Sequence, residues 1–199
     1  MPKRTAKADN SSRPGRLRIV AGNWRSRLLH IADVPGLRPT AERIRETLFN
    51  WLAPRIEGAR CLDLFAGTGA LGLEALSRGA ATAVLVENSK RAARSLAENI
   101  RALDARGAVL READAFEYLH AAQDGPFDIV FLDPPFAIDR LDELCRLLAG
   151  GPLLAAGAWI YLEEDRGGAA TELPDGWQVL KTKSAGNVRY SLVATATTG

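Results

Sequence analysis

Residues 61–72 read CLDLFAGTGALG, and this stretch decides the fold. An apolar run leads into a turn that carries Gly67, Gly69 and Gly72, and a helical pattern follows over residues 73–78. Glycines at this spacing between a strand and a helix let the backbone approach a ligand and let the helix pack closely on the strand. The stretch therefore predicts the first strand, ligand-binding turn and helix of an α/β sheet.

Three acidic residues lie near the expected ends of strands. Asp63 lies inside the first strand, Glu87 ends the strand pattern of residues 82–86, and Asp114 follows that of residues 108–111. An acid at the tip of the second strand is placed to accept both hydroxyls of a ribose. A carboxylate inside the first strand suits a cationic ligand, such as a sulfonium amino acid, better than a pyrophosphate. The pattern therefore favours S-adenosylmethionine, with Asp114 as an acceptor for the adenine amine.

The predicted cofactor-binding residues are those of the turn and of the acidic strand ends with their neighbours. They are Asp63, Phe65, Gly67, Gly69, Gly72, Glu87, Asn88, Asp114 and Ala115. A nicotinamide oxidoreductase uses the same kind of turn and stays as an alternative, which the carboxylate of Asp63 disfavours.

A second motif, Asp133-Pro134-Pro135-Phe136, directly follows the apolar strand pattern of residues 127–132. The prolines carry no N–H and stiffen the backbone, so the Pro134 carbonyl is free to face a ligand. Asp133 adds a second acceptor, and Phe136 offers a surface on which a base can stack. These four residues are the predicted catalytic group, which holds a flat amine beside an electrophile. Prolines that merely end a buried strand would give the same pattern.

The rest of the chain alternates strands with helices. Helical patterns cover residues 89–103, 115–122 and 139–148, and strand patterns cover residues 158–163, 177–183 and 188–195. This alternation predicts an α/β fold with a doubly wound, mostly parallel, seven-stranded Rossmann-like sheet and a C-terminal antiparallel hairpin around residues 185–187. Ligands bind at the carboxyl ends of the strands in such sheets, so the turn, the acids and Asp133 are expected at one mouth.

The N-terminal part of the chain is basic. Residues 1–30 contain eight Lys or Arg and one acid, whereas the rest contains 18 basic and 23 acidic residues, for a net charge of +2. A basic arm on a slightly acidic body suggests contact with a polyanion. We expect residues 1–15 to be a disordered basic tail and residues 16–199 to be one domain, with an N-terminal extension over residues 16–55. A tail that only aids solubility would explain the charge of residues 1–15 equally well.

Within that extension, Gly22-Asn23 predicts the two-residue turn of a short β-hairpin. Strand alternation would place Arg16 and Arg18 on one face, and likewise Arg25 and Arg27, as a basic ribbon for the phosphates of a nucleic acid. A plain amphipathic hairpin is the alternative.

A helix is expected after Pro39, with Thr40 as its N-cap and Glu42 in its first turn. Its buried stripe consists of Ile44, Leu48, Trp51 and Leu52. Arg43 and Arg45 are expected to lie off that stripe.

Six stretches resemble the RsmD family, small bacterial methyltransferases that modify a guanine N2 amine of 16S ribosomal RNA with S-adenosylmethionine. They are DLFAGTGALGLEALSRGA (63–80), VEN (86–88), FLDPPF (131–136), residues 18–25, LRPTAERIRETLFNWL (37–52) and residues 183–192. The resemblance implies a 16S RNA substrate, which we expect to be bound within a 30S subunit or an assembly intermediate. It also implies that the helix after Pro39 borders the active site, where Arg38, Thr40 and Arg43 would contact RNA or cofactor. Arg38 and Arg43 are therefore added to the predicted RNA-binding residues, although the sequence alone equally allows a structural covering helix.

The resemblance leads to a hypothesis for the reaction. A guanine leaves the RNA stack and lies against Phe136, because an enzyme that acts on a base must first expose it. Asp133 and the Pro134 carbonyl accept hydrogen bonds from the N2 amine and orient it toward the sulfonium methyl, so positioning supplies most of the acceleration.

Two other functions fit part of the pattern. A DNA or RNA adenine-N6 methyltransferase shares the Asp-Pro-Pro-aromatic motif but usually carries a separate target-recognition region, for which 199 residues leave little room. A non-catalytic RNA-binding assembly factor would keep the fold without binding S-adenosylmethionine.

The composition indicates the compartment in which the protein is expected. No run approaches the roughly 18 apolar residues of a membrane span, and the polar N-terminus has no apolar signal-peptide core. Cys61 and Cys145 lie far apart in apolar segments, which suggests buried free thiols in a reducing cytoplasm. The sequence contains no metal-ligand spacing, and a cytoplasmic monomer without a bound metal is expected.

Overall fold

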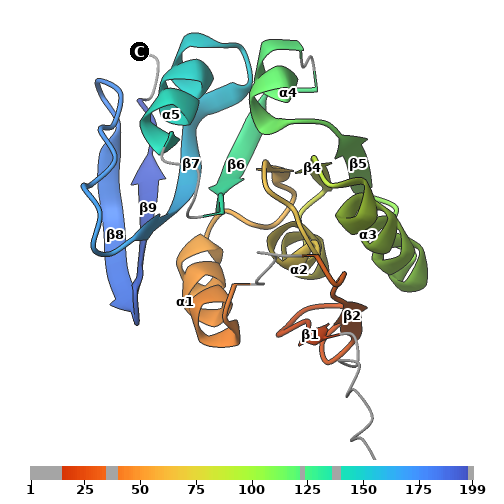
Figure 1. The fold of residues 1–199 in the computed structure, drawn as a ribbon. Helices are drawn as coiled ribbons and strands as arrows, with labels where there is room; N and C mark the ends of the chain where they lie inside the picture. The colour runs from red at the N-terminus through yellow and green to blue at the C-terminus, as the bar shows by residue number, and fades with distance from the viewer. Residues whose placement is uncertain (1–14, 35–39, 122–123, 136–139, 197–199) are drawn as a thin grey trace, which may run out of the picture.

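The computed structural model describes residues 15–34, 40–121, 124–135 and 140–196, with a seven-stranded sheet at its centre. The strands are β3 (Arg60–Asp63), β4 (Thr82–Glu87), β5 (Ala108–Glu112), β6 (Phe127–Leu132), β7 (Leu154–Asp165), β8 (Gln178–Ala185) and β9 (Val188–Ala194). Their order across the sheet is β5-β4-β3-β6-β7-β9-β8 (Figure 1). The first five strands of this order are parallel, and β9 is antiparallel to both β7 and β8. The predicted α/β fold with a mostly parallel sheet and a C-terminal antiparallel hairpin is confirmed.

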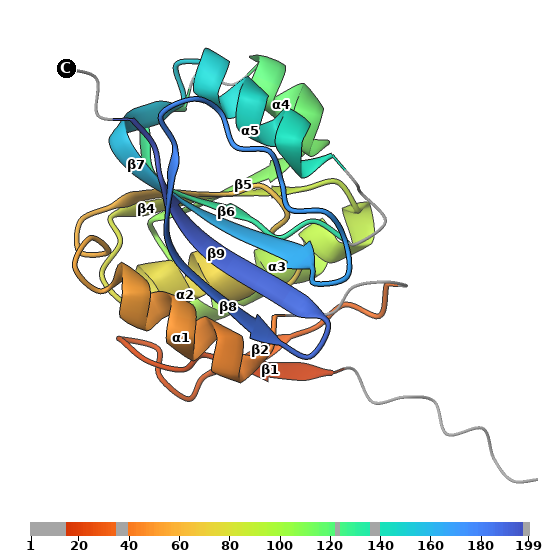
Figure 2. The same ribbon diagram turned by 90° about the vertical axis from the view of Figure 1, so that its left-hand side faces the viewer.

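Helices cover both faces of this sheet. In the described part of the chain they are α1 (Glu42–Leu52), α2 (Ala70–Ser77), α3 (Lys90–Leu103), α4 (Ala115–Ala121) and α5 (Leu141–Gly150). Figures 1 and 2 show α4 and α5 on one face and the other three helices on the opposite face. Buried apolar side chains alternate along each inner strand between two clusters, one under each helical layer. Burial on both faces explains why these strands read as nearly continuous apolar runs.

The N-terminal hairpin differs from the prediction. Strands β1 (Arg16–Arg18) and β2 (Leu28–His30) form a separate antiparallel sheet, and residues 19–27 connect them, so the predicted two-residue turn at Gly22-Asn23 is wrong. The connecting segment packs on α2 instead of extending the two strands. The Glu74 carboxylate accepts hydrogen bonds from the N–H groups of Val20 (2.8 Å) and Ala21 (3.0 Å).

Gly22 lies against the end of α2 in a conformation that requires glycine. Its φ is +82°, and a Cβ at this position would lie 1.8 Å from the Ser77 carbonyl oxygen. The next N–H, that of Asn23, donates to the same carbonyl at 2.7 Å. The glycine-asparagine pair therefore serves docking on α2 rather than a tight turn.

Arg45 is a second correction, because it is 1% exposed rather than off the buried stripe of α1. Its guanidinium pairs with the fully buried Glu74 of α2 at 3.3 Å and donates to the carbonyl of Arg18 at 2.9 Å. A buried carboxylate requires a cationic or hydrogen-bonding partner, and this need overrides the helical pattern. Trp51 is only partly buried, whereas the other three residues of the predicted stripe are buried.

Two expectations from composition can also be compared with the structure. Both cysteines are buried and free, as predicted, and burial raises the pKa of each thiol. Within the residues that the structure describes, no helix is long and apolar enough to cross a membrane.

Candidate active site

The candidate site lies at the carboxyl edge of the parallel strands. Asp63 ends β3, Glu87 ends β4, and Asp133 directly follows β6. Because β3 pairs in parallel with both β4 and β6, these three acids share one edge of the sheet. Asp114 follows β5, which is parallel to β4. We call this edge, with the turn that follows β3, the mouth.

Two of these acids hold the glycine turn from its two ends. The Gly67 N–H donates to Oε2 of Glu87 at 2.8 Å, and the Gly72 N–H donates to Oδ2 of Asp63 at 3.0 Å. The carboxylates thus fix the backbone of the turn at both ends.

The three glycines of the turn are required for two different structural reasons. Gly67 and Gly69 have φ values of +52° and +84°, which side chains with a Cβ rarely adopt. A Cβ on Gly72 would lie 2.2 Å from Cδ2 of Leu85, so this glycine lets α2 pack closely on β4.

Asp63 carries a buried carboxylate with one unsatisfied oxygen. The residue is 1% exposed, and its Oδ1 has no hydrogen-bond partner among the described residues. Burial raises the pKa of Asp63 to about 7, and the Gly72 hydrogen bond opposes this rise. The backbone N–H of Phe65 lowers the pKa of Asp63 as well. A buried acceptor without a partner costs free energy, so Oδ1 marks a place for a donor or cation of a ligand.

Glu87 and Asp114 also bind backbone groups next to them. Oε1 of Glu87 accepts a 2.7 Å hydrogen bond from the Ser89 N–H. Oδ1 of Asp114 accepts from the N–H groups of Phe116 (2.8 Å) and Glu117 (3.3 Å), an arrangement that caps α4. Each carboxylate oxygen has two lone pairs, so both acids keep capacity to accept hydrogen bonds from a ligand.

The remaining predicted cofactor residues surround these acids. Asn88 is exposed, Phe65 is partly buried, and Ala115 is buried in the cluster under α4 and α5. The Ala115 methyl therefore belongs to the core, which leaves only the backbone of this residue for a contact with a ligand. The roles of these three residues stay predictions.

Asp133 lies partly buried at the mouth. The Thr40 hydroxyl donates to its Oδ2 at 2.7 Å, and this bond opposes the rise that burial causes in the pKa of Asp133. Pro134 is buried and Pro135 is exposed. Phe136 and Arg38 lie outside the described residues, as does the basic tail of residues 1–14, so the roles assigned to them stay predictions.

The prediction that Thr40 caps α1 is wrong. The helix begins at Glu42, and its N-cap residue, Ala41, makes no side-chain capping bond. The hydroxyl of Thr40 binds the carboxylate of Asp133 instead, because a charged acceptor makes the stronger hydrogen bond. Glu42 lies in the first turn, as expected.

Glu163 belongs to the mouth, although the sequence motifs did not predict it, and Tyr161 is a buried core residue beside it on β7. Asp133 directly follows Leu132, Glu163 directly follows Leu162, and these two leucines are partners across β6 and β7. Glu163 is buried and accepts a 2.7 Å hydrogen bond from the Tyr161 hydroxyl. Burial, followed by the charge of Asp133, raises the pKa of Glu163. An acid at the end of a predicted strand was a signal available in the sequence.

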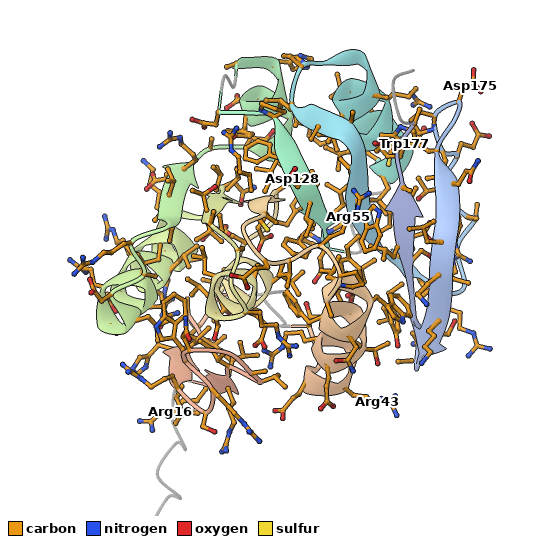
Figure 3. All side chains as sticks on the ribbon, turned by 180° about the vertical axis from the view of Figure 1, so that it is seen from behind. Arg16, Arg43, Arg55, Asp128, Asp175 and Trp177 are labelled. Carbon is orange, nitrogen blue, oxygen red and sulfur yellow. The ribbon has the colours of Figure 1, made fainter. Side chains whose placement is uncertain are left out.

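The predicted RNA-binding arginines in the described part of the chain are all exposed. Arg16 and Arg18 share one face of β1, as predicted, whereas Arg25 and Arg27 lie in the loop instead of a strand. Nη2 of Arg27 donates to the Ala102 carbonyl at the end of α3, at 2.8 Å. Figure 3 places Arg16 and Arg43, the latter on α1, at the same end of the molecule. That these residues bind RNA stays a prediction.

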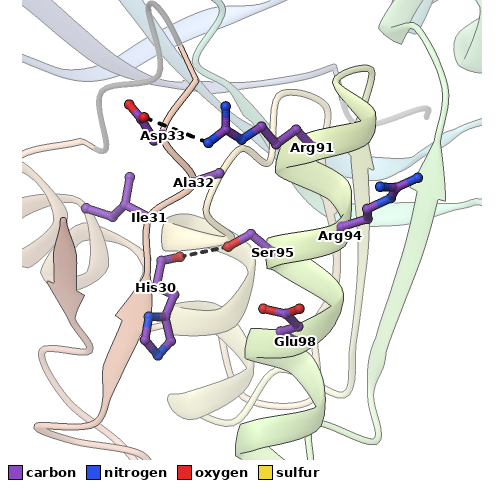
Figure 4. Close-up of a pocket in the computed structure, with 8 residues that line it drawn as sticks. All are labelled: His30, Ile31, Ala32, Asp33, Arg91, Arg94, Ser95 and Glu98. Atoms are coloured by element: carbon purple, nitrogen blue, oxygen red, sulfur yellow. Dashed lines mark hydrogen bonds and ion pairs between the residues drawn. The ribbon is translucent and has the colours of Figure 1, made fainter. Parts of the chain in front are cut away.

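An open cleft lies between the end of β2 and α3 (Figure 4). Its charged residues are Arg91, Arg94 and Glu98 on α3, with Asp33 on the facing segment. Arg91 pairs with Asp33 at 3.8 Å, and the two arginines are balanced by the two acids. The cleft therefore has no net charge that would select an anionic ligand, and the mouth remains the candidate active site.

Comparisons with known proteins agree with this architecture. A model of the family described as Conserved hypothetical protein 95 matches residues 17–194. Ribosomal RNA small subunit methyltransferase D of Escherichia coli (strain K12) is 47% identical over 187 residues, which cover 94% of this chain and 93% of that protein. The protein of the same name from Haemophilus influenzae is 41% identical over 181 residues, which cover 89% and 93%.

A solved structure leads to the same family. That of yhhF from Escherichia coli matches with a TM-score of 0.85 and 43% sequence identity, over 92% of this chain and 99% of that chain. These matches span the glycine turn, the acids of the mouth and the Asp-Pro-Pro-Phe motif. The chain belongs to the RsmD family of methyltransferases.

Proposed function

We propose that this protein transfers a methyl group from S-adenosylmethionine to the exocyclic N2 amine of a guanine in 16S ribosomal RNA. The observation that carries this proposal is the mouth itself. Asp63 offers an unsatisfied buried oxygen there, and Asp133 is held by Thr40 in front of Pro134. The names of the two relatives, ribosomal RNA small subunit methyltransferase D, support the choice of substrate.

The residues of the mouth fit S-adenosylmethionine. Oδ1 of Asp63 suits the cationic amino group of its methionine part, because a buried carboxylate with a free oxygen favours a charged donor. Glu87 suits the ribose hydroxyls, Asp114 the adenine amine, and the turn at Gly67 allows close approach of the backbone. When bound, the molecule supplies a methyl group on an electrophilic sulfonium.

The acceptor side consists of Asp133 and its motif. Asp133 and the Pro134 carbonyl accept hydrogen bonds from the two N–H groups of the target amine and orient its nitrogen, while Phe136 stacks on the base. Thr40 holds the Asp133 carboxylate in one orientation by its 2.7 Å hydrogen bond. The amine proton becomes acidic only as the new bond to carbon forms, so Asp133 acts by positioning before it acts as a proton acceptor.

The RNA side extends from the mouth to the N-terminal hairpin. Arg16, Arg18, Arg25, Arg27 and Arg43 are exposed and carry the charge needed to position a phosphate backbone. One small protein reads little sequence alone, so we include in the proposal that the substrate is a 30S subunit or an assembly intermediate. The proposal places the protein in the cytoplasm as a monomer, with residues 16–199 as one domain.

The experiment is to incubate the protein with methyl-labelled S-adenosylmethionine and small subunits from cells that lack this gene. The RNA is then digested, and the labelled nucleoside is identified. Label in N2-methylguanosine at one site is the expected result. Label in another nucleoside would overturn the guanine assignment, and cofactor binding without any label would overturn the choice of substrate.

A further inference from the structure

The α1-facing side of the sheet carries a row of residues that leads from the mouth to its edge strand. Lys183 on β8 is the partner of Tyr190 on β9, and Tyr190 is the partner of Glu163 on β7. Glu163 ends this row beside Asp133, because both residues directly follow the paired leucines of β7 and β6. Residues paired across neighbouring strands point to the same side of a sheet, so this row shares one face.

The identity of that face follows from aromatic packing. The Trp51 ring on α1 stacks on the Tyr190 ring, with centroids 5.4 Å apart and planes 27° apart. Lys183 therefore points to the same side of the sheet as α1. Lys181, the partner of Leu192, lies two residues earlier on β8 and points the same way. Both lysines are exposed.

The same side of α1 contributes a third positive charge. Arg43, Thr47 and Trp51 follow each other at four-residue spacing and form one stripe along the helix. Since Trp51 faces β9, this stripe faces the two last strands, and Figures 2 and 3 show α1 beside β9 and Arg43 toward the end of β8. Relative to Arg43, Glu42 lies about 100° and Glu46 about 60° around the helix, both on the side away from Thr47 and Trp51.

We propose that Lys181, Lys183, Arg43 and Trp51 form an RNA-binding surface that holds the phosphate backbone beside the target nucleotide. We call it the edge surface, and it rests on the proposed RNA substrate. Cations interleaved with a partly exposed aromatic ring suit single-stranded nucleic acid, because phosphates meet the charges and a base meets the ring.

The distance between Lys183 and Asp133 suits the binding of RNA next to the target nucleotide. Three strand spacings of about 4.8 Å separate Lys183 from Asp133 along the row, which is about 14 Å, or roughly four nucleotides at a helical rise of about 3.4 Å. A contact at this distance anchors the strand next to the base that enters the mouth. Figure 1 shows β1 and β2 on the other side of α1 from β8 and β9, so the hairpin and the edge surface lie on either side of this helix.

The test compares two double variants that each remove two positive charges. K181A/K183A changes the edge surface, and R106A/R146A is the matched control. Arg106 precedes β5 at the amino edge of the sheet, and Arg146 lies on α5 over the opposite face. Methylation of small subunits is measured between 50 and about 200 mM salt, and binding of S-adenosylmethionine is measured by calorimetry.

We expect K181A/K183A to raise the KM for small subunits about tenfold at physiological salt, with kcat and cofactor affinity unchanged. The slope of log affinity against log salt should become shallower by about 1.4, the effect of losing two phosphate contacts to a single strand. A KM and slope equal to those of R106A/R146A would overturn the edge surface.

Two further outcomes are decisive. Lysines on an edge strand also prevent strand pairing between molecules. If K181A/K183A associates in solution while its monomers keep the KM of the control, the two lysines prevent strand pairing and do not bind RNA. If the unsubstituted protein binds S-adenosylmethionine but transfers no methyl group to RNA, the proposed function fails, and the RNA partner of the edge surface fails with it.

Discussion

The Thr40 hydroxyl donates a 2.7 Å hydrogen bond to Oδ2 of Asp133 and joins two motifs that lie 93 residues apart. Thr40 is buried directly before α1, and Asp133 lies at the mouth. The bond fixes the orientation of the carboxylate that holds the target amine in the proposed function. It also stabilises the ionised form of Asp133 and so lowers its pKa, which opposes the rise caused by burial. In the proposed function, the segment before α1 therefore belongs to the active site and is more than a cover for the sheet.

Thr40→Val should lower kcat by about 10- to 100-fold, because a hydrogen bond to a charged group contributes about 1.5–3 kcal/mol. The measurement is the single-turnover rate of methyl transfer to small subunits. Thr40→Ser keeps the hydroxyl and should retain most of the rate. Equal rates for the valine and serine variants would show that the bond has no part in catalysis.

Asp133→Ala should reduce turnover by roughly 10²-fold or more while S-adenosylmethionine binding stays close to normal, because the residue orients the acceptor and not the cofactor. Calorimetry measures the binding, and methyl transfer measures the turnover. Asp175→Ala is the control, since Asp175 is exposed in the segment before β8 (Figure 3). Normal turnover of the Asp133 variant would remove this residue from the site.

The sequence predicted the sheet, its antiparallel hairpin and the positions of the acids, because these depend on local patterns. The turn at Gly67 and the strand before Asp133 can be recognised from adjacent residues alone. Glu163 could have been found by the same reasoning, since it ends a predicted strand.

The errors concern residues whose partners are distant in sequence. Arg45 is buried because Glu74, 29 positions later, needs a partner. Thr40 leaves its expected capping role for Asp133, and Gly22 docks on Ser77 rather than forming a tight turn. In each case a contact that only the tertiary fold creates outweighs a local preference.

Glu74 links three elements, and its loss should destabilise the protein strongly. Glu74→Ala leaves the buried guanidinium of Arg45 unpaired and the N–H groups of Val20 and Ala21 without an acceptor. We expect a loss of about 3–5 kcal/mol in the free energy of unfolding, measured in urea, and faster amide exchange at residues 20 and 21. Glu46→Ala, an exposed glutamate on α1, should change the unfolding free energy by less than about 0.5 kcal/mol. A similar small change for Glu74→Ala would contradict the role of this buried network.

Asp63 should make the stability of the ligand-free protein depend on pH. Its folded-state pKa is about 7, above the ordinary value of 3.8, so the folded protein binds this proton more tightly than the unfolded chain does. The sign is opposite to that of a salt-bridged acid: burial of Asp63 costs little below pH 4, and the cost grows as pH rises from 4 to 7 and is complete above that.

Asp63→Asn removes this titration and keeps an oxygen for the Gly72 N–H. The variant should gain stability relative to the unsubstituted protein as pH rises, by up to about 4 kcal/mol between pH 4 and pH 8, since each pKa unit corresponds to about 1.36 kcal/mol. Urea unfolding at both pH values without ligand measures the difference.

S-adenosylmethionine should bind the variant more weakly, and binding to the unsubstituted protein should release a proton near pH 6, because a cationic ligand favours the ionised carboxylate. Calorimetry in buffers of different ionisation enthalpy detects that proton, and proton-free binding together with pH-independent stability would show that Asp63 is already ionised in the free protein.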